Sequence, residues 1–369
     1  MDAHPSGTTT VDAPSNDSRD QGLALSSSPA MELVTVPHDP SDDDPVVRRA
    51  AERLRAGLLV AFPTETVYGL GAHALDEAAV ARIYAAKGRP AHNPVIVHVA
   101  DEHAAREVVA AWTPHAELLA RHFWPGPLTL VLPKSARVPA SVVAGLDKVG
   151  VRVPAHPVAL ALLRAARVPV AAPSANRSNE VSPTTARHVV DSLGDADLLV
   201  LDGGACGVGI ESTVVDVSGA RPVLLRPGGV ARDELERVLG VAVSTPREAH
   251  GDEPRAAPGM LSKHYATRAP LVATPHGDRA ALEARLAGTG AGRSLAALVF
   301  ESTARALPEG VHVVAMPLDP RACARRLYAA LRELDARAPE LIVVEDPPQG
   351  VAWDALRDRL ARAAAGARA

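Results

Sequence analysis

Residues 57–71 read GLLVAFPTETVYGLG, and this stretch decides the fold that we expect for the chain. Residues 57–62 have the composition of a buried strand, which ends at Pro63 because proline cannot donate a hydrogen bond to a sheet. The polar residues and glycines that follow therefore stand at a strand exit. Open α/β sheets bind ligands at such exits, so Thr66 is a candidate binding residue.

Helical and strand-like patterns alternate on both sides of this stretch. A helical apolar spacing covers 42–55, and further helices are predicted over 76–86, 101–110, 115–121, 156–166, 184–192 and 231–239. Strands are predicted over 57–62, 94–99, 128–132, 149–153, 168–172, 198–202, 213–217 and 222–226. This alternation predicts an α/β or α+β domain over 33–240. Its sheet should be mixed, because VVDVSGARPVLL (214–225) has the pattern of an antiparallel hairpin.

Three further segments complete the predicted organisation. Residues 1–32 are rich in Ser, Thr, Asp and Pro, which predicts a disordered tail. Residues 241–268 combine Pro, Gly and charge with little periodicity, which indicates a linker. Residues 269–369 alternate strand patterns with helical ones and predict a small domain with a parallel sheet. Its strands are expected at 296–300, 311–315 and 340–344, and its helices at 278–288, 320–334 and 350–364.

Composition narrows the classes of protein to which the chain belongs. Of its 369 residues 47% are hydrophobic and 22% are charged, and the net charge of -4 argues against a surface devoted to nucleic acid. No apolar run reaches the roughly 18 residues of a membrane span. Cys206 and Cys323 form no CxxC pair and the fourteen histidines are scattered, so we expect free thiols, a cytoplasmic protein and no metal site.

A second polar cluster, KGRPAHNP at 87–94, leads into the strand VIVHV. Lys87 offers a point charge and Arg89 a planar fork, a combination that suits polyphosphate oxygens. The alternative is a helix C-terminus whose macrodipole favours cations. His98, on the strand, is either a packed core histidine or a ligand contact.

A third cluster follows the strand VPVAA (168–172). Ser174 and Asn176 supply hydrogen-bond donors at the strand exit. Ser182, a few residues further on, either caps the next helix or binds an anion near its N-terminus.

Other cations stand beside strands. Arg152 has valines on both sides, so its stem must be buried and its guanidinium should pair with an anion. Lys148 precedes the same strand, and Arg226 precedes a Pro-Gly-Gly turn. The sequence contains no GxxxxGK[ST] loop, GxGxxG, HExxH or GxSxG. Any nucleotide must therefore be bound by the separate Lys, Arg, Ser and Asn clusters.

Together these clusters resemble the YrdC-like family, the threonylcarbamoyl-AMP synthases. The family signature pairs K-x-R with S-x-N, and here these read KGR (87–89) and SAN (174–176). PTETVYGLG, KGRPAHNPVIVHV, FWPGPLTLVL, VGVRVPAHP, APSAN and ESTVVDV with LLRPG follow the order of the family across about 33–230. APGMLSKHYATRAPL resembles the linker of the long, two-domain members.

The resemblance implies a YrdC-like mixed, twisted sheet with helices, then a linker, then a small Rossmann-like parallel α/β domain. It implies that L-threonine is surrounded by Thr66, His98, Arg152, Ala172 and Ser212. It also implies that ATP contacts Arg89, Asn93, Lys148, Ser174, Asn176, Ser182, Arg226 and Tyr265. Within these sets we expect Arg152 to hold the threonine carboxylate, and Lys87 with Arg89 to stabilise the triphosphate. Tyr265 would belong to a lid formed by the linker.

The activity implied by the resemblance is synthesis of threonylcarbamoyl-AMP and pyrophosphate from L-threonine, bicarbonate or CO2, and ATP with Mg2+. The product would serve threonylcarbamoyladenosine modification of tRNAs that read codons beginning with A. The implied partners are a downstream tRNA threonylcarbamoyl transferase complex and, weakly, RNA. Two alternatives stay open: a non-catalytic RNA-binding translation factor, and a carbamoyl transferase acting on another acceptor.

Overall fold

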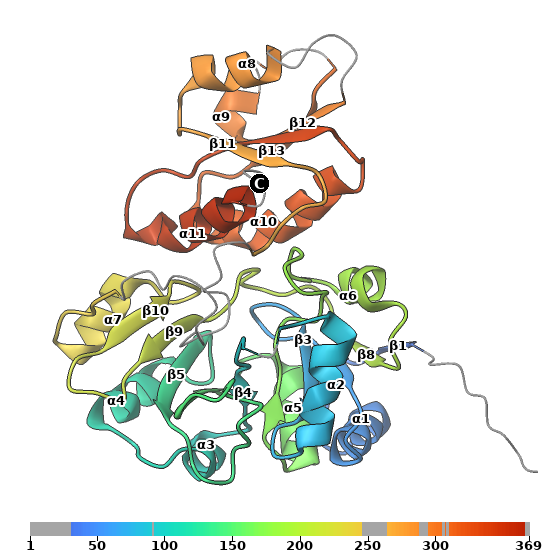
Figure 1. The fold of residues 1–369 in the computed structure, drawn as a ribbon, viewed down its shortest axis with the longest axis vertical. Helices are drawn as coiled ribbons and strands as arrows, with labels where there is room; N and C mark the ends of the chain where they lie inside the picture. The colour runs from blue at the N-terminus through green and yellow to red at the C-terminus, as the bar shows by residue number, and fades with distance from the viewer. Residues whose placement is uncertain are drawn as a thin grey trace, which may run out of the picture.

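The structure is a computed structural model that describes residues 31–90, 92–245, 264–287, 294–304, 307 and 310–365. The described residues up to Leu239 form a large sheet with helices packed on it, and those from Leu271 onward form a small sheet with its own helices (Figure 1). Most of the predicted tail, and residues 246–263 of the predicted linker, lie outside the described residues. The domain boundaries therefore stay predictions. No helix in the described ranges has both the length and the apolar character needed to cross a membrane.

The large sheet has the strand order β1-β8-β2-β3-β7-β4-β6-β5-β9-β10. Its strands are β1 (Glu32–Thr35), β2 (Val60–Phe62), β3 (Gly69–His73), β4 (Val97–His98), β5 (Leu128–Pro133), β6 (Lys148–Arg152), β7 (Val170–Ala171), β8 (Leu199–Asp202), β9 (Thr213–Asp216) and β10 (Val223–Arg226). β4 pairs with β6 in parallel, whereas β5 pairs with β6 and β9 with β10 antiparallel. The predictions of a mixed sheet and of a hairpin near 214–225 are confirmed.

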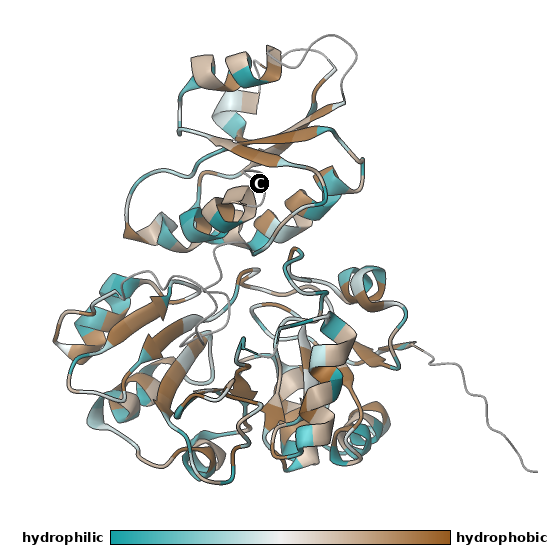
Figure 2. Ribbon diagram, in the orientation of Figure 1, coloured by the Kyte–Doolittle hydropathy of each residue, from teal (hydrophilic) through white to brown (hydrophobic). Residues whose placement is uncertain are grey.

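Helices cover both faces of this sheet. They are α1 (Pro45–Arg55), α2 (Glu77–Lys87), α3 (Glu102–Val108), α4 (Pro114–Phe123), α5 (Pro157–Ala166), α6 (Ala186–Leu193) and α7 (Arg232–Leu239). Val60 and Phe62 of β2 pack in a cluster with α1 and α5, while Ala61 between them packs with α2 on the opposite face. Alternate residues of a strand point to opposite faces, so β2 is apolar throughout because both of its faces are buried. Figure 2 shows the same pattern, with hydrophobic strands inside and polar helix faces outside.

Several predicted strands, including 57–62, are shorter in the structure, and two strands of the large sheet, β1 and β3, were not predicted. The predicted strands 94–99 and 168–172 shrink to β4 and β7, of two residues each, and both segments contain a proline before the paired residues. β3 was missed because its two glycines lower its strand propensity. Gly71 is needed there, since a Cβ at this position would lie 2.8 Å from the Cε1 atom of Phe62 and 2.9 Å from the Cγ1 atom of Val170.

The small sheet is entirely parallel, as predicted, with the order β11-β14-β12-β13. Its strands are β11 (Leu271–Thr274), β12 (Leu295–Phe300), β13 (His312–Met316) and β14 (Leu341–Glu345), and β11 was not predicted. The helices are α8 (Arg279–Ala287), α9 (Glu301–Ala304), α10 (Pro320–Asp335), the 3-10 turn η1 (Val351–Trp353) and α11 (Asp354–Ala364). α10 and α11 lie on the side of the small sheet that faces the large one (Figure 1).

The two parts of the chain share a buried apolar cluster. Val67, Val181 and Ile210 come from loops of the large sheet and pack with residues of α10 and α11. Gly209 adopts a φ of 82°, and a Cβ there would lie 2.4 Å from the Cα atom of Arg325 in α10. The backbone of this loop therefore rests directly on α10, which fixes where the small domain sits relative to the strand exits.

Candidate active site

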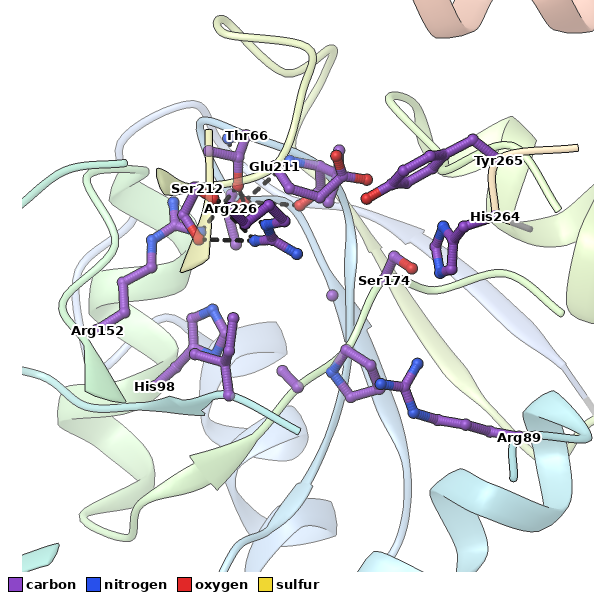
Figure 3. A pocket seen from close by; sticks show the side chains of 16 residues that line it. Thr66, Arg89, His98, Arg152, Ser174, Glu211, Ser212, Arg226, His264 and Tyr265 are labelled. Atoms are coloured by element: carbon purple, nitrogen blue, oxygen red, sulfur yellow. Dashed lines mark hydrogen bonds between the residues drawn. The ribbon is translucent and has the colours of Figure 1, made fainter. Parts of the chain in front are cut away.

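A pocket that is partly open to solvent lies where strands of the large sheet end (Figure 3). Its lining is polar and rich in arginine, and comprises Thr64, Thr66, Val67, Gly69, Arg89, Ile96, His98, Arg152, Ala172, Pro173, Ser174, Glu211, Ser212, Arg226, His264 and Tyr265. The structure thus brings together the predicted residues Thr66, Arg89, His98, Arg152, Ala172, Ser174, Ser212, Arg226 and Tyr265. Lys87, Asn93, Lys148, Asn176 and Ser182 do not line this pocket.

Arg152, the last residue of β6, is held from three directions. Its Nε donates to the carbonyl oxygen of Gly126 at 3.1 Å, Nη1 to Oγ1 of Thr66 at 2.9 Å, and Nη2 to Oε1 of Glu65 at 2.5 Å. The Thr66 hydroxyl is also 2.8 Å from that of Thr64. A guanidinium carries five N–H donors, so two remain for a ligand. The predicted anion partner is therefore present within the protein as Glu65, and Arg152 is fixed in orientation.

His98 ends β4 and is buried against Phe62, whose ring centre lies 6.3 Å from the imidazole centre. Burial, with a smaller contribution from Arg152, lowers the pKa of His98 to about 3. The imidazole is therefore neutral near pH 7. Its Nδ1 is buried and has no hydrogen-bond partner within the described ranges.

Ser212 and Arg226 form the wall provided by β9 and β10. Arg226 donates from Nη2 to both the carbonyl oxygen and the hydroxyl of Ser212, at 2.8 and 3.2 Å. The Ser212 hydroxyl is 2.8 Å from that of Thr129. Gly228 allows this turn, because a Cβ there would lie 2.4 Å from the backbone carbonyl carbon of Ser212.

Arg89 is presented by the end of α2. Gly88 ends the helix in the left-handed conformation, with φ 58° and ψ 36°, which turns the chain toward the pocket. Arg89 donates from Nε and Nη2 to the carbonyl oxygens of Asn93 and Pro94 at 3.1 and 2.8 Å. Burial is the main cause that lowers the pKa of Arg89 to about 10, so the side chain stays charged near neutral pH. The side-chain amide of Asn93 is buried and unpartnered in the described part of the chain.

Lys87 has a different position from the one predicted. Its ammonium donates to the carbonyl oxygens of Ser174 and Asn176 and is buried beneath the loop that they form. Asn176 in turn donates from Nδ2 to the carbonyl oxygens of Arg177 and Glu180. Lys87 therefore joins the K-x-R and S-x-N segments, and its side chain does not line the pocket.

Ser182 and Lys148 also differ from expectation. Ser182 does not cap α6, because Thr185 is the N-cap residue; the Ser182 hydroxyl donates to Oε1 of Glu211 at 2.6 Å. Lys148 stands at the start of β6, at the opposite end from Arg152, and pairs with Asp216 at 2.8 Å. The structure thus gives no support to a contact between Lys148 and a nucleotide.

His264 and Tyr265 enter the pocket from the segment that precedes β11 (Figure 3). Tyr265 has a left-handed φ of 61°, is fully buried, and stacks on Tyr328 with ring centres 5.6 Å apart. Its hydroxyl has no partner among the described residues. Burial lowers the pKa of His264 to about 3, so this imidazole is also neutral.

The buried histidines predict loss of stability in acid. Unfolded histidine titrates near pH 6.5. The folded pKa values of His98 and His264 are both about 3, so the unfolded chain binds more protons between these limits. The free energy of unfolding is therefore highest above about pH 6.5 and falls as the pH falls toward 3. At about pH 5 each histidine should have lowered it by about 2 kcal/mol.

Urea unfolding across this pH range measures the effect. His98→Asn should flatten the dependence of the unfolding free energy on pH. His103→Asn is the control, because the His103 side chain is 89% exposed. Equal slopes for wild type and His98→Asn would contradict the prediction.

Sequence reasoning missed several residues of the site. Glu65 and Glu211 stand inside quoted motifs, PTETVYG and ESTVVDV, but received no role. His264 precedes the predicted Tyr265 directly and was not singled out. Adjacency to predicted ligand residues was the available signal for all three.

Comparisons with known proteins agree with this arrangement. A sequence model of the Sua5/YciO/YrdC family, described as telomere recombination, matches residues 52–228, and one described as the threonylcarbamoyl-AMP synthase C-terminal domain matches 230–365. The threonylcarbamoyl-AMP synthase of Bacillus subtilis is 40% identical over 347 residues, 90% of this chain and 97% of that protein. The one from Pyrococcus abyssi is 51% identical over 228 residues, 61% of this chain and 67% of that protein.

A solved structure shares the whole architecture. The crystal structure of Pyrococcus abyssi Sua5 complexed with L-threonine has a TM-score of 0.83 and 40% sequence identity, covering 91% of this chain and 98% of that chain. The large mixed sheet with helices on both faces, the arginine-rich pocket and the small parallel domain thus define a protein of the long, two-domain class. The chain belongs to the Sua5/YciO/YrdC family of threonylcarbamoyl-AMP synthases.

Proposed function

We propose that this chain makes threonylcarbamoyl-AMP and pyrophosphate from L-threonine, CO2 or bicarbonate, and ATP. One observation carries the proposal: Arg89, Arg152 and Arg226, all buried, converge on one pocket whose lining includes the single carboxylate of Glu211. Such an excess of fixed positive charge suits a polyanion together with a carboxylate substrate.

L-Threonine binds in the half of the pocket formed by β4 and β6. The fixed fork of Arg152 pairs with the amino acid carboxylate through the donors that Glu65 and Thr66 leave free. Neutral His98 offers its unpartnered Nδ1, and Ala172 and Ser212 bound the space around the side chain. A relative supports this substrate, since Pyrococcus abyssi Sua5 has been crystallised in complex with L-threonine.

ATP binds in the other half, between Arg89, Ser174, Arg226 and Tyr265. Arg89 and Arg226 stabilise the phosphates, and Lys87 keeps Ser174 in place beside them. Mg2+ would be held by phosphate oxygens and water, because the lining is cationic and the carboxylate of Glu211 is already engaged by protein donors. Bound there, the ion would neutralise phosphate charge.

The reaction needs positioning more than a protein nucleophile. The neutral α-amine of threonine adds to CO2 and releases a proton to solvent to give a carbamate; if bicarbonate is the source, water is lost instead. A carbamate oxygen attacks the α-phosphorus of ATP, and the bond to the bridging oxygen breaks to release pyrophosphate. Arg152 fixes the nucleophile, while Arg89 and Arg226 stabilise the charge that develops on the phosphates.

His264 and Tyr265 cover the pocket and exclude water from a labile product. In the cytoplasm, the product would pass to a tRNA threonylcarbamoyl transferase complex for modification of tRNAs that read codons beginning with A. Lid movement of the linker as a whole stays a prediction, since residues 246–263 lie outside the described residues.

Pyrophosphate release from ATP, Mg2+ and bicarbonate, with and without L-threonine, tests the proposal on the purified chain. Release that depends on threonine is the expected result. No release, together with tight RNA binding, would overturn it in favour of the RNA-binding alternative. Pyrophosphate release with another amine acceptor and none with threonine would point to a different carbamoyl transfer.

A further inference from the structure

Glu211 connects the pocket to the small domain. The residue lies directly before Ser212 and β9, is buried, and lines the pocket. Its Oε1 accepts from the Ser182 hydroxyl at 2.6 Å. Its Oε2 accepts from Nε of Arg359 and from the hydroxyl of Tyr328, both at 2.8 Å. One oxygen is thus bound by the large domain and the other by the small domain.

Both small-domain partners are themselves buried. Arg359 lies in α11 and is 1% exposed, and Tyr328 lies in α10 and is fully buried. The Arg359 guanidinium is also 5.3 Å from the ring centre of Tyr265, which stacks on Tyr328. The small domain therefore contacts both the carboxylate of the pocket and its aromatic cover.

The charge on Glu211 is unfavourable for the proposed substrate. Burial alone would raise the pKa of this carboxyl, but Arg359 and Arg226 lower it to about 2, so the group is ionised. A carboxylate in the lining repels a triphosphate unless a cation neutralises it. Arg226 contributes to neutralisation but also faces the pocket, where phosphate would compete for it. Arg359 binds Glu211 from outside the pocket lining and is not subject to that competition.

We propose that Arg359 of the small domain is a positioning residue for ATP: it neutralises Glu211 from behind the pocket, so that the carboxylate in the lining does not repel the triphosphate. The inference rests on the proposed function, because it assumes that the pocket takes a nucleoside triphosphate. It gives the small domain a part in substrate binding that acts through Glu211.

A double-mutant cycle tests the proposal. Arg359→Met leaves the Glu211 charge unpaired and should weaken binding of a non-hydrolysable ATP analogue about tenfold or more, measured by calorimetry. The KM for ATP should rise in parallel, and the KM for L-threonine much less. Arg359→Met combined with Glu211→Gln should regain most of the nucleotide affinity, because the repelling charge is gone. Double-mutant affinity as low as that of Arg359→Met, or lower, would overturn the proposal.

Matched variants separate charge from packing. Arg357→Met lies on the same helix, but Arg357 pairs with Asp354 and not with Glu211, so its nucleotide affinity should equal that of wild type. Tyr328→Phe removes one donor to Glu211, keeps the ring, and should weaken nucleotide binding by a smaller factor. If Arg359→Met does not fold, unchanged affinity in Tyr328→Phe would refute the idea.

The outcomes also distinguish this inference from the proposed function. Nucleotide affinity is measured without threonine or turnover. A wild-type chain that binds the analogue but shows no threonine-dependent pyrophosphate release would defeat the proposed function and leave the cycle of Arg359 and Glu211 intact. Threonine-dependent release with no rescue in the double variant would defeat only the inference.

Discussion

Arg89→Ala should lower kcat/KM for threonine-dependent pyrophosphate release about 30- to 900-fold. Removal of one preorganised, charge-stabilising donor costs about 2 to 4 kcal/mol in the transition state. Arg89 meets this description because its stem and two nitrogens are fixed by the carbonyl oxygens of Asn93 and Pro94 while the side chain lines the pocket. Steady-state kinetics with varied ATP measures the effect.

The control for this variant is Arg82→Ala. Arg82 is on the same helix, α2, and is exposed, so its replacement should leave kcat/KM unchanged. Circular dichroism confirms that both variants are folded. A folded Arg89→Ala protein with nearly wild-type kcat/KM would remove Arg89 from the proposed phosphate site.

The sequence predicted the elements of the fold well where their hydrophobic period was clear. Three strands of the small parallel sheet, the hairpin of β9 and β10, and the helices of the large domain follow from such periods. β3 could not be predicted in this way, because Gly71 is selected by the close approach of Phe62 and Val170 rather than by strand propensity. Neighbours that are distant in sequence determine residues of this kind.

The sequence predicted which residues form the site more completely than it predicted their contacts. The valines around Arg152 predicted a buried guanidinium with an anion, but the anion, Glu65, is 87 positions away and meets it only through the sheet topology. Lys87 illustrates the same limit. Its charge suggested phosphate binding, whereas in the folded protein its ammonium donates hydrogen bonds to backbone carbonyl oxygens of the S-x-N segment. Charge can be read from a sequence, but the partner that a charge finds depends on the three-dimensional fold.

Arg359 and Glu211 show why the role of the small domain could not be predicted from the sequence. Nothing in α11 marks Arg359 among the many arginines of the chain, because its importance comes from burial against a residue of the other domain. In the structure it is a charged side chain that is 1% exposed, and such groups are rarely retained without a partner.

Arg152→Met should have the largest combined effect, because Arg152 belongs to a buried ion pair and is also the residue that we propose to bind the substrate carboxylate. Its side chain is 4% exposed and that of its partner Glu65 14% exposed. Removing one member of a buried pair leaves an uncompensated charge, so the free energy of unfolding should fall by about 3 to 5 kcal/mol. The KM for L-threonine should rise about 10- to 100-fold through loss of charge-assisted hydrogen bonds to the carboxylate. Urea unfolding and kinetics with varied threonine measure the two effects.

A second substitution separates these roles. Arg152→Met combined with Glu65→Gln removes the stranded charge and should recover part of the lost stability, yet the KM for L-threonine should stay high because no guanidinium faces the carboxylate. Arg137→Met breaks the exposed pair with Glu107 and should cost less than about 1 kcal/mol. Recovery of both stability and threonine KM in the double variant would mean that Arg152 only compensates Glu65, and the substrate carboxylate would then have to be held elsewhere in the pocket.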